Sequence, residues 1–297
     1  MDHDVLLDQT FKVYKSNRSL RAIPQDQREY ILLNLSKFLF RAYQNHSTDI
    51  IPIYDSYESI KDGLKLTFNG LEYGGYKLNQ LSIKHKSSSI LSKQAFVFLS
   101  SDQSSSEFNT VILNRVSSSS TNVSANEFII SLLENLDLDD PFVIREHRFG
   151  YHSIKEVSNQ LTDEETDKYL LGDIELVYVM HFNHINENLR HIIINVPNKD
   201  IQNMNNAGLI DNINMFLQEN SKIDFQKLSI LKFSSASVNI SIDGKIKIFG
   251  EKFKGHMRLR EQVSNNTDDS NEDPFGHPFI WRLLCSLFHQ ILNVNTI

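Results

Sequence analysis

Four side chains in the middle of the sequence have the chemistry of a zinc site. His181, His184 and His191 follow one another closely, and Glu187 lies among them. Three imidazoles, or two imidazoles and a carboxylate, form the usual ligand set of catalytic zinc. Their spacing, however, matches no compact zinc motif such as His-Glu-x-x-His. We therefore expect ordinary loop or core histidines here, and we predict no metal ion and no cofactor.

A second polar cluster mixes acid, base and imidazole side chains. It consists of Arg145, Glu146, His147, Arg148 and His152. On a strand, alternation places Glu146 and Arg148 on the same face, so surface ion pairing explains the cluster without catalysis. The sequence contains no Gly-x-Ser-x-Gly elbow, no phosphate-binding Gly-rich loop followed by Lys-Ser/Thr, and no Cys-x-x-Cys pair. We predict no catalytic residues.

The most strongly charged segment, residues 245–260, places cations beside aromatic rings. Such pairs contact phosphates and stack on bases in nucleic-acid-binding proteins. Lysines on an edge strand can instead prevent unwanted strand pairing, and an acidic protein partner is a third interpretation. We keep all three open. The predicted partner-binding residues are Lys245, Lys247, Lys252, Phe253, Lys254, Arg258 and Arg260, which only Glu251 opposes.

Length and composition are those of an ordinary globular protein. The chain has 297 residues, of which 40% are hydrophobic and 23% charged, enough for one large domain or two ordinary ones. The net charge of -7 argues against bulk attraction to nucleic acid or anionic membranes, although a local patch can still bind them. Cys285 is the single cysteine and cannot form an internal disulfide, so packing must stabilise the fold.

The strongest local pattern lies between residues 173 and 196. Residues 173–182 and 189–196 are rich in β-branched and aromatic residues and are apolar on both faces for part of their length. This pattern predicts two strands covered on both sides. The polar residues between them favour a hairpin connection, and Pro197 ends the second strand.

The N-terminal half is predicted to be a helix followed by a strand meander. A helix is predicted from Pro24 to about Tyr43. Its apolar residues, between Tyr30 and Ala42, cover most of its circumference, which is typical of a deeply packed helix. Asn69-Gly70 indicates a tight turn and Gly74-Gly75 a further break. The strand patterns are at residues 64–68, 76–85, 95–99 and 110–116.

Capping boxes indicate three helix starts in the middle of the chain. A hydroxyl residue precedes a glutamate by three positions at Ser124/Glu127, Ser153/Glu156 and Thr162/Glu165. The first of these helices has its apolar residues on one face. Residues 141–149, between the first two starts, are predicted to be a strand.

The C-terminal third allows a prediction of strand register. Residues 237–242 and 245–250 alternate as strands, and a three-residue loop with Gly244 at positive φ would pair Ile240 with Ile246 and Val238 with Ile248. A helix over residues 279–293 has an apolar stripe wider than half its circumference, so it is either core or an interface for a partner.

These elements predict an α+β fold with two α+β modules in series, each a mainly antiparallel meander or hairpin sheet flanked by helices. We place the modules at residues 1–138 and 139–297, with the central hairpin at 173–196 in the second. An unbroken single sheet is the alternative.

The function that fits best is a non-catalytic scaffold or adaptor subunit of a multiprotein complex, because a chain of adequate size shows no catalytic constellation. It would bind protein partners through sheet edges or the C-terminal helix. The alternative is a nucleic-acid-associated factor that uses residues 245–260, and a histidine-based metalloenzyme ranks third. The N-terminus lacks the basic and apolar regions of a signal peptide, and residues 30–43 are too polar to span a membrane. We therefore expect an intracellular protein, cytoplasmic or nuclear.

Overall fold

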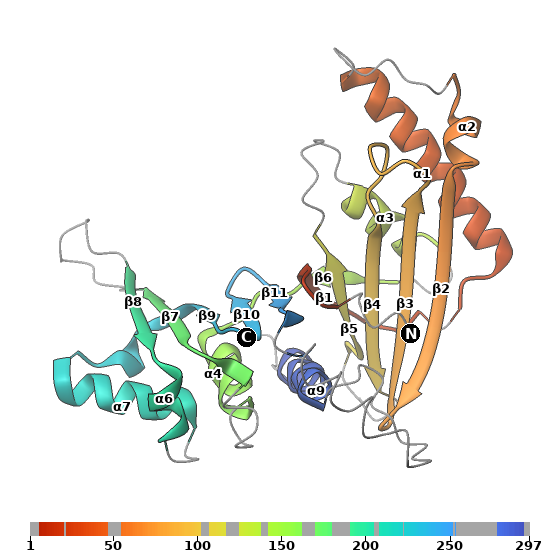
Figure 1. Cartoon of the computed structure of the whole chain (residues 1–297). Helices are drawn as coiled ribbons and strands as arrows, with labels where there is room; N and C mark the ends of the chain where they lie inside the picture. The colour runs from red at the N-terminus through yellow and green to blue at the C-terminus, as the bar shows by residue number, and fades with distance from the viewer. Residues whose placement is uncertain are drawn as a thin grey trace, which may run out of the picture. The chain divides into compact units, whose positions relative to one another are not determined.

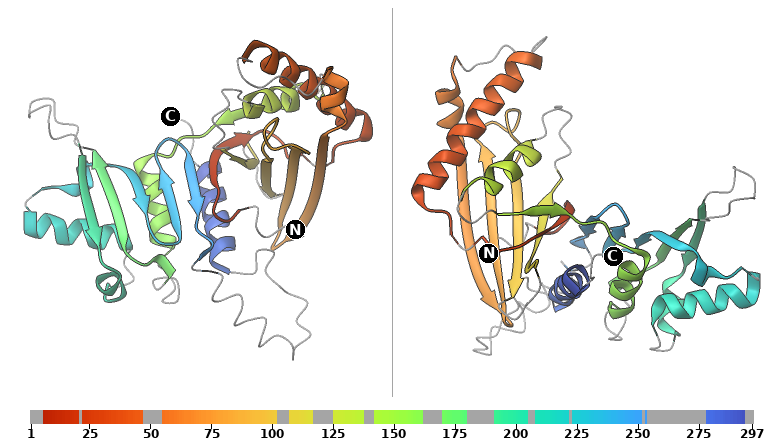
Figure 2. Two further views of the ribbon diagram at one scale, coloured as in Figure 1. Left: turned by 45° about the horizontal axis from the view of Figure 1, so that its top comes forward. Right: turned by 180° about the vertical axis from the view of Figure 1, so that it is seen from behind.

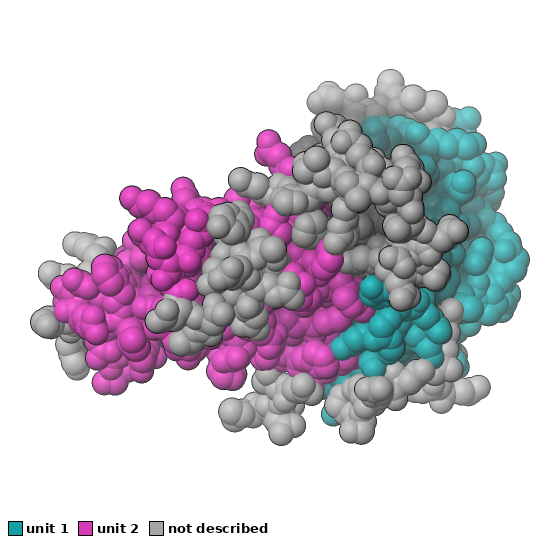
Figure 3. Space-filling model, turned by 60° about the horizontal axis from the view of Figure 1, so that its bottom comes forward, with its two compact units in different colours: residues 1, 11–146 teal, residues 2–10, 147–297 magenta. Residues whose placement is uncertain are grey.

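The chain is an α+β protein with extensive antiparallel strand pairing (Figure 1). The computed structural model describes residues 6–20, 22–46, 55–101, 107–116, 125–137, 142–161, 170–179, 191–204, 208–221, 223–251, 253 and 278–293. The chain divides into two compact units, coloured separately in Figure 3. The first consists of residues 11–146 with residue 1, and the second of residues 2–10 and 147–297. None of the described helices is both long and apolar enough to cross a bilayer.

A sheet of antiparallel strands runs through the first unit. The strands are β1 (Thr10–Ser16), β2 (Leu64–Tyr73), β3 (Tyr76–His85), β4 (Gln94–Ser101), β5 (Thr110–Arg115) and β6 (Ile144–Glu146). They lie in the order β2-β3-β4-β5-β1, and β6 also pairs with β1. The predicted meander over residues 64–116 is therefore confirmed. Residues 141–149 contain a shorter strand than we expected.

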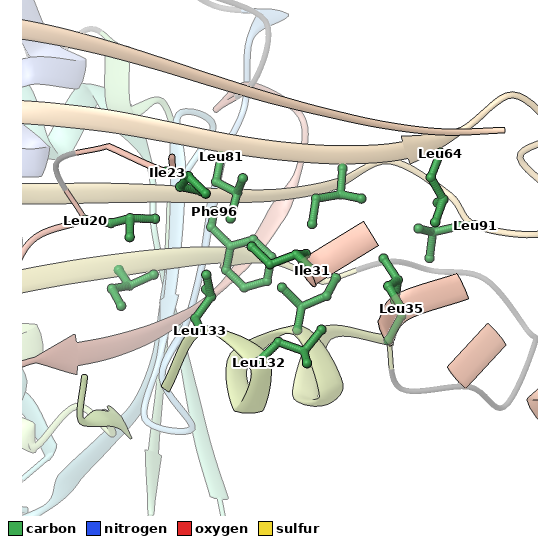
Figure 4. Close-up of a cluster of buried hydrophobic side chains, with 14 of the residues drawn as sticks. Leu20, Ile23, Ile31, Leu35, Leu64, Leu81, Leu91, Phe96, Leu132 and Leu133 are labelled. Carbon is green, nitrogen blue, oxygen red and sulfur yellow. The ribbon is translucent and has the colours of Figure 1, made fainter. Parts of the chain in front are cut away.

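Helices cover one face of this sheet. They are α1 (Gln25–His46), α2 (Tyr57–Lys61) and α3 (Ala125–Glu134), and Figure 2 (right) shows α1 and α3 across the strands. Apolar residues from both layers form one buried cluster, which includes Ile31, Leu35, Leu81, Phe96 and Leu133 (Figure 4). The helix predicted at residues 24–43 is α1, but the prediction that it is deeply packed is wrong. Ile31, Leu35 and Leu39 are buried against the sheet, whereas Tyr30 is 44% exposed, because the helix is covered on one side only.

The predicted turn at Asn69-Gly70 is wrong. Both residues lie inside β2, where Asn69 pairs with Gln80 and Gly70 with Asn79. The chain turns instead at Gly74-Gly75, because Tyr73 pairs directly with Tyr76. The two glycines have φ angles of 57° and 81°, which a two-residue turn of this hand requires. Long-range pairing with β3 has thus overridden a local turn signal.

The strands of the second unit also pair antiparallel. They are β7 (Ile174–Val179), β8 (His191–Val196), β9 (Ser229–Ser234), β10 (Val238–Ser241) and β11 (Lys245–Ile248). They lie in the order β8-β7-β9-β10-β11. The N-terminal segment joins this unit, because Leu7 forms a parallel bridge with Ile248 and the Asp8 amide donates to the Ile248 carbonyl over 2.7 Å.

The helices of the second unit lie on one face of its sheet (Figure 2, left). They are α4 (Tyr151–Gln160), α6 (Asn198–Gln202), α7 (Leu209–Ser221) and α9 (Pro278–Asn293), with a short 3₁₀ turn, η2, at Phe225–Lys227. Alternate strand residues, including Leu176, Phe233 and Ile240, are fully buried, and the residues between them point to the other face. One-sided covering produces this inside-outside alternation.

Two local predictions in this unit have opposite outcomes. The register is confirmed, because Ile240 pairs with Ile246, Val238 pairs with Ile248, and Gly244 has a φ of 77°. The prediction that Ser153 begins a helix with a capping box is wrong. Helix α4 begins at Tyr151 after Gly150, so Ser153 lies inside the helix and is 4% exposed. The other two capping boxes include residues outside the described part of the chain.

Candidate interaction surface

The β7–β8 hairpin has a different environment from the one its sequence predicts. The two strands pair as expected, with Leu176 opposite Ile194 and Val179 opposite His191. The prediction that both are covered on both sides is wrong: β8 is the outermost strand, and only one residue in two of β7 is buried. Strand β7 pairs with β8 on one side and with β9 on the other, and β8 is the last strand in the order, so the hairpin lies at the border of its sheet.

Strand β8 therefore has an unpaired edge within the described part of the chain. Its sequence, His-Ile-Ile-Ile-Asn-Val, contains no proline, lysine or acidic residue. Ile193 is 58% exposed, whereas Val196 is buried. Native sheets usually protect such edges with charges, proline or a covering element. An apolar and uncharged edge strand is typical of a surface that accepts another strand.

The end of β8 is fixed by side-chain hydrogen bonds. The Asn198 backbone amide donates to the Asp173 carboxylate over 2.8 Å, and the Asn198 side chain donates to the Gly172 carbonyl over 3.0 Å. Pro197, which cannot donate a ladder hydrogen bond, precedes Asn198. These contacts join the end of β8 to the beginning of β7 and hold the edge in place.

The open face of the same sheet is polar. Lys232, Asn239 and Lys247 point to this face, and so does Glu175, whose carboxylate lies 3.1 Å from the Lys232 ammonium. A hollow of about 660 Å³ is lined in part by Glu175, Lys232 and Asn239. Its wall includes Phe249, and the Lys247 ammonium lies 4.6 Å from the centre of the Phe249 ring.

The predicted basic segment is only partly described by the structure. Lys245 is exposed at the start of β11, and its ammonium lies 2.5 Å from the Asp243 carboxylate. Partial burial alone would raise the pKa of Asp243, but hydrogen bonds from Lys245 and Ser241 outweigh it and lower that pKa. The remaining cations, Lys252, Lys254, Arg258 and Arg260, lie outside the described residues.

Phe253 lies away from the surface. Its side chain is 0% exposed, and its ring packs against Phe279 of α9 with 5.5 Å between ring centres. A fully buried ring cannot stack on a base without unfolding its surroundings. The apolar face of helix α9 is also buried within this chain, because Phe279, Leu283 and Leu287 are at most 1% exposed.

The histidine cluster is mostly beyond what the structure describes. His181, His184 and Glu187 lie outside the described residues, and His191 is exposed on β8. Within the described ranges no group of histidine, cysteine and acidic side chains could hold a metal ion. In the other polar cluster, Glu146 forms a 2.7 Å ion pair with Lys12 of the neighbouring strand. The Arg145 guanidinium lies 5.2 Å from the centre of the Phe108 ring.

No protein-family model matches this sequence, and no curated protein is significantly similar to it. The exposed edge of β8 is the feature that sequence reasoning missed. One signal was present, because proline at the end of a strand suits an edge position, but the strongly apolar run of β8 is typical of a buried strand.

Proposed function

We propose that the protein is a non-catalytic interaction subunit, a scaffold or adaptor, of an intracellular multiprotein complex in the cytoplasm or nucleus. In this proposal a partner protein adds a strand along β8. The observation that carries it is the combination of an outermost position, an uncharged sequence and a 58% exposed Ile193 in one strand.

Strand addition needs two things from the receiving edge. Backbone N–H and C=O groups supply the affinity, at about 0.5–1.5 kcal/mol net for each hydrogen bond formed. Side chains beside the edge supply the specificity, since an added strand places alternate residues on each face. Ile193, on the open face, would contact the partner's outward side chains.

Other possible docking elements fit less well. Strand β2 is also at the border of its sheet, but it contains Lys65 and Glu72, charges that disfavour pairing with another strand. The apolar face of α9 is already buried in the chain. The two predicted docking routes, a sheet edge or the C-terminal helix, are therefore unequal, and we favour the sheet edge.

The experiment compares three baits in affinity purification from the native cells: the natural chain, Ile193→Lys and Met215→Lys. Met215, on α7, is 57% exposed, so it gives the same change at matched exposure on another element. We expect partner chains that co-purify with the natural chain and with Met215→Lys but are lost with Ile193→Lys. Hydrogen exchange of the β8 amides should then be slower in the purified complex than in the free chain.

Equal recovery of the same chains by all three baits would remove β8 as the docking edge. Unchanged exchange at β8 in a stable complex would do the same. Ile193→Lys and Met215→Lys must first have the same unfolding midpoint as the natural chain. A loss of binding then cannot be due to a loss of folding.

Nucleic-acid association through residues 245–260 remains the second candidate. Lys245 and Lys247 support it, since both point to the open sheet face near Phe249. The burial of Phe253 and the Lys245–Asp243 ion pair weaken it. Filter binding to single-stranded and duplex nucleic acids at several salt concentrations separates the two functions, because phosphate contacts produce a steep salt dependence.

We also retain, as part of this proposal, two α+β modules in series. Such a chain could bind one partner on the β8 edge while the first module remains available for another.

A further inference from the structure

The first unit contains a hollow of about 510 Å³ at one end of its sheet. Ser100 and Ser101 at the end of β4, and Asn109 just before β5, form one wall. The beginning of α1 and the end of α3 contribute Gln27 and Leu136. Cavities of about 300–1,000 Å³ that combine apolar walls with a few polar groups are typical of small-molecule sites.

The inner wall of this hollow is apolar and belongs to the core. Leu20, Leu133 and Phe142 line it and are 9%, 0% and 2% exposed. All three belong to the cluster of Figure 4, which shows Leu20 and Leu133 projecting toward Phe96. An apolar group bound here would be removed from water.

The rim of the hollow carries charged side chains. Among the described residues that line it, Arg18 and Lys77 contribute two cations and Asp137 contributes one carboxylate, and the Lys77 ammonium also lies 4.0 Å from the Glu72 carboxylate. The Arg18 guanidinium is 3.5 Å from Asp137 and 5.5 Å from the centre of the Phe142 ring, so it lies at the border between rim and apolar wall. A guanidinium has five N–H donors, which allows it to bind a ligand and Asp137 together.

The buried Ser19 hydroxyl is a further polar group beside the hollow. The Ser19 hydroxyl oxygen is inaccessible to solvent and has no hydrogen-bond partner among the described residues. Ser19 lines the hollow next to Arg18 in sequence. A buried hydroxyl without a partner costs free energy. Rotation of the Ser19 side chain into the hollow would bring this hydroxyl within reach of an oxygen atom of a bound ligand, which would remove that cost.

We infer that this hollow binds a small amphipathic anion. Its carboxylate or phosphate head would contact Arg18 and Lys77, with an oxygen near the Ser19 hydroxyl. Its aromatic or branched apolar body would lie against Leu20, Leu133 and Phe142. This site lies in the first unit and does not depend on the β8 edge, so it is independent of the proposed function.

The test uses the full chain with a matched pair of probes, 2-naphthoate and 2-naphthamide, in titration calorimetry. The probes share one ring system and differ in charge. We expect 2-naphthoate to bind with a dissociation constant between about 10 μM and 1 mM, at least fivefold tighter than the amide. A parallel titration with 2-naphthyl phosphate shows which anionic head the rim prefers.

Three substitutions test whether the probes bind in this hollow. Arg18→Gln should weaken 2-naphthoate about tenfold and the amide less than twofold, because one charge-assisted contact is lost. Lys65→Gln removes the same charge from an exposed position of β2 outside the hollow, and should change neither affinity. Ala22→Trp, at an exposed position on the wall, should abolish binding of both probes by filling the space.

Equal affinity of the two naphthyl probes, or no binding at millimolar concentration, would overturn the inference. So would equal effects of Arg18→Gln and Lys65→Gln, or unchanged binding by Ala22→Trp. If Arg18→Gln does not fold, Lys77→Gln takes its place with the same expected result.

Discussion

At the scale of single residues, Gly244 shows how one position sets a strand register. It ends a three-residue loop with a φ of 77°, where an L side chain costs about 1–2 kcal/mol. A Cβ atom there would also lie 2.1 Å from the His147 carbonyl oxygen. Both the loop conformation and the close approach of another backbone segment therefore require glycine.

Gly244→Ala should lower the free energy of unfolding by about 3 kcal/mol or more, as measured by urea denaturation. Gly75→Ala is the matched control, because Gly75 has a φ of 81° but no atom within 4 Å of a built Cβ. It should cost only about 1–2 kcal/mol. Equal losses for the two variants would show that the His147 carbonyl does not constrain this loop.

Tyr178 is a second residue whose environment makes a measurable prediction. It is 0% exposed, its hydroxyl donates to the Asn214 side-chain oxygen over 2.8 Å, and its ring packs edge-on against Phe225. Burial raises the pKa of the Tyr178 phenol above its ordinary value of 10.0. In the unfolded chain the same phenol ionises near pH 10.

The unfolded state therefore gains an ionised phenol above pH 10 while the folded state keeps Tyr178 neutral. This contribution to stability is complete below pH 10 and is lost as the pH rises toward the raised value, by up to about 1.4 kcal/mol per pH unit. Urea unfolding between pH 8 and 11 should show a shallower decline in Tyr178→Phe than in the natural chain. Parallel declines would contradict the raised pKa.

At the scale of elements, the β7–β8 hairpin shows that its sequence predicts the strands but not how many of their faces are covered. Leu176 and Val177 are neighbours on β7, but Leu176 is 0% exposed whereas Val177 lies on the partly exposed face. Covering by helices on one side only produces this difference. A strand covered on both sides would bury both residues equally.

Leu176→Ala should therefore cost about 2–5 kcal/mol of unfolding free energy, and Val177→Ala less than about 1 kcal/mol. Urea denaturation of both variants measures the difference. Similar large losses at both positions would mean that the open face is covered after all, which would also weaken the case for strand addition at β8.

At the scale of the whole molecule, the chain crosses between its compact units twice. Residues 142–146, which lie near the middle of the chain, belong to the first unit, where β6 pairs with β1. Residues 6–8 belong to the second unit, where the Asp8 carboxylate accepts from the Gly250 amide over 2.9 Å. Each unit therefore contains strand contacts between segments that are far apart in the sequence.

This crossing predicts the behaviour of a chain cut between residues 138 and 139. A protease site inserted there should yield two fragments that co-elute in gel filtration, because each unit retains strand pairing between them. Leu7→Ala, which truncates a 7% exposed side chain, should weaken this association, whereas Leu71→Ala on the partly exposed face of β2 should not. Fragments that separate without denaturant would contradict the pairing.

The sequence by itself determined the α+β class, the meander of β2 to β5, the β7–β8 hairpin and the register around Gly244. These features follow from the two-residue repeat of strands, from turn residues and from the opposed apolar pairs, all of which act over short distances. The misplaced turn at Asn69-Gly70 shows the limit of such signals, because pairing with β3 outweighs them.

Only the tertiary structure decided that β8 is an edge strand, that Phe253 is buried, and that Arg18, Ser19 and Lys77 meet at one hollow. An apolar run specifies that a strand is stable in a sheet, but its neighbours are chosen by contacts between residues far apart in sequence. Burial of Phe253 depends on α9, and the hollow on the ends of several strands and two helices. Lateral strand order and the convergence of distant side chains are thus set by packing of the whole unit.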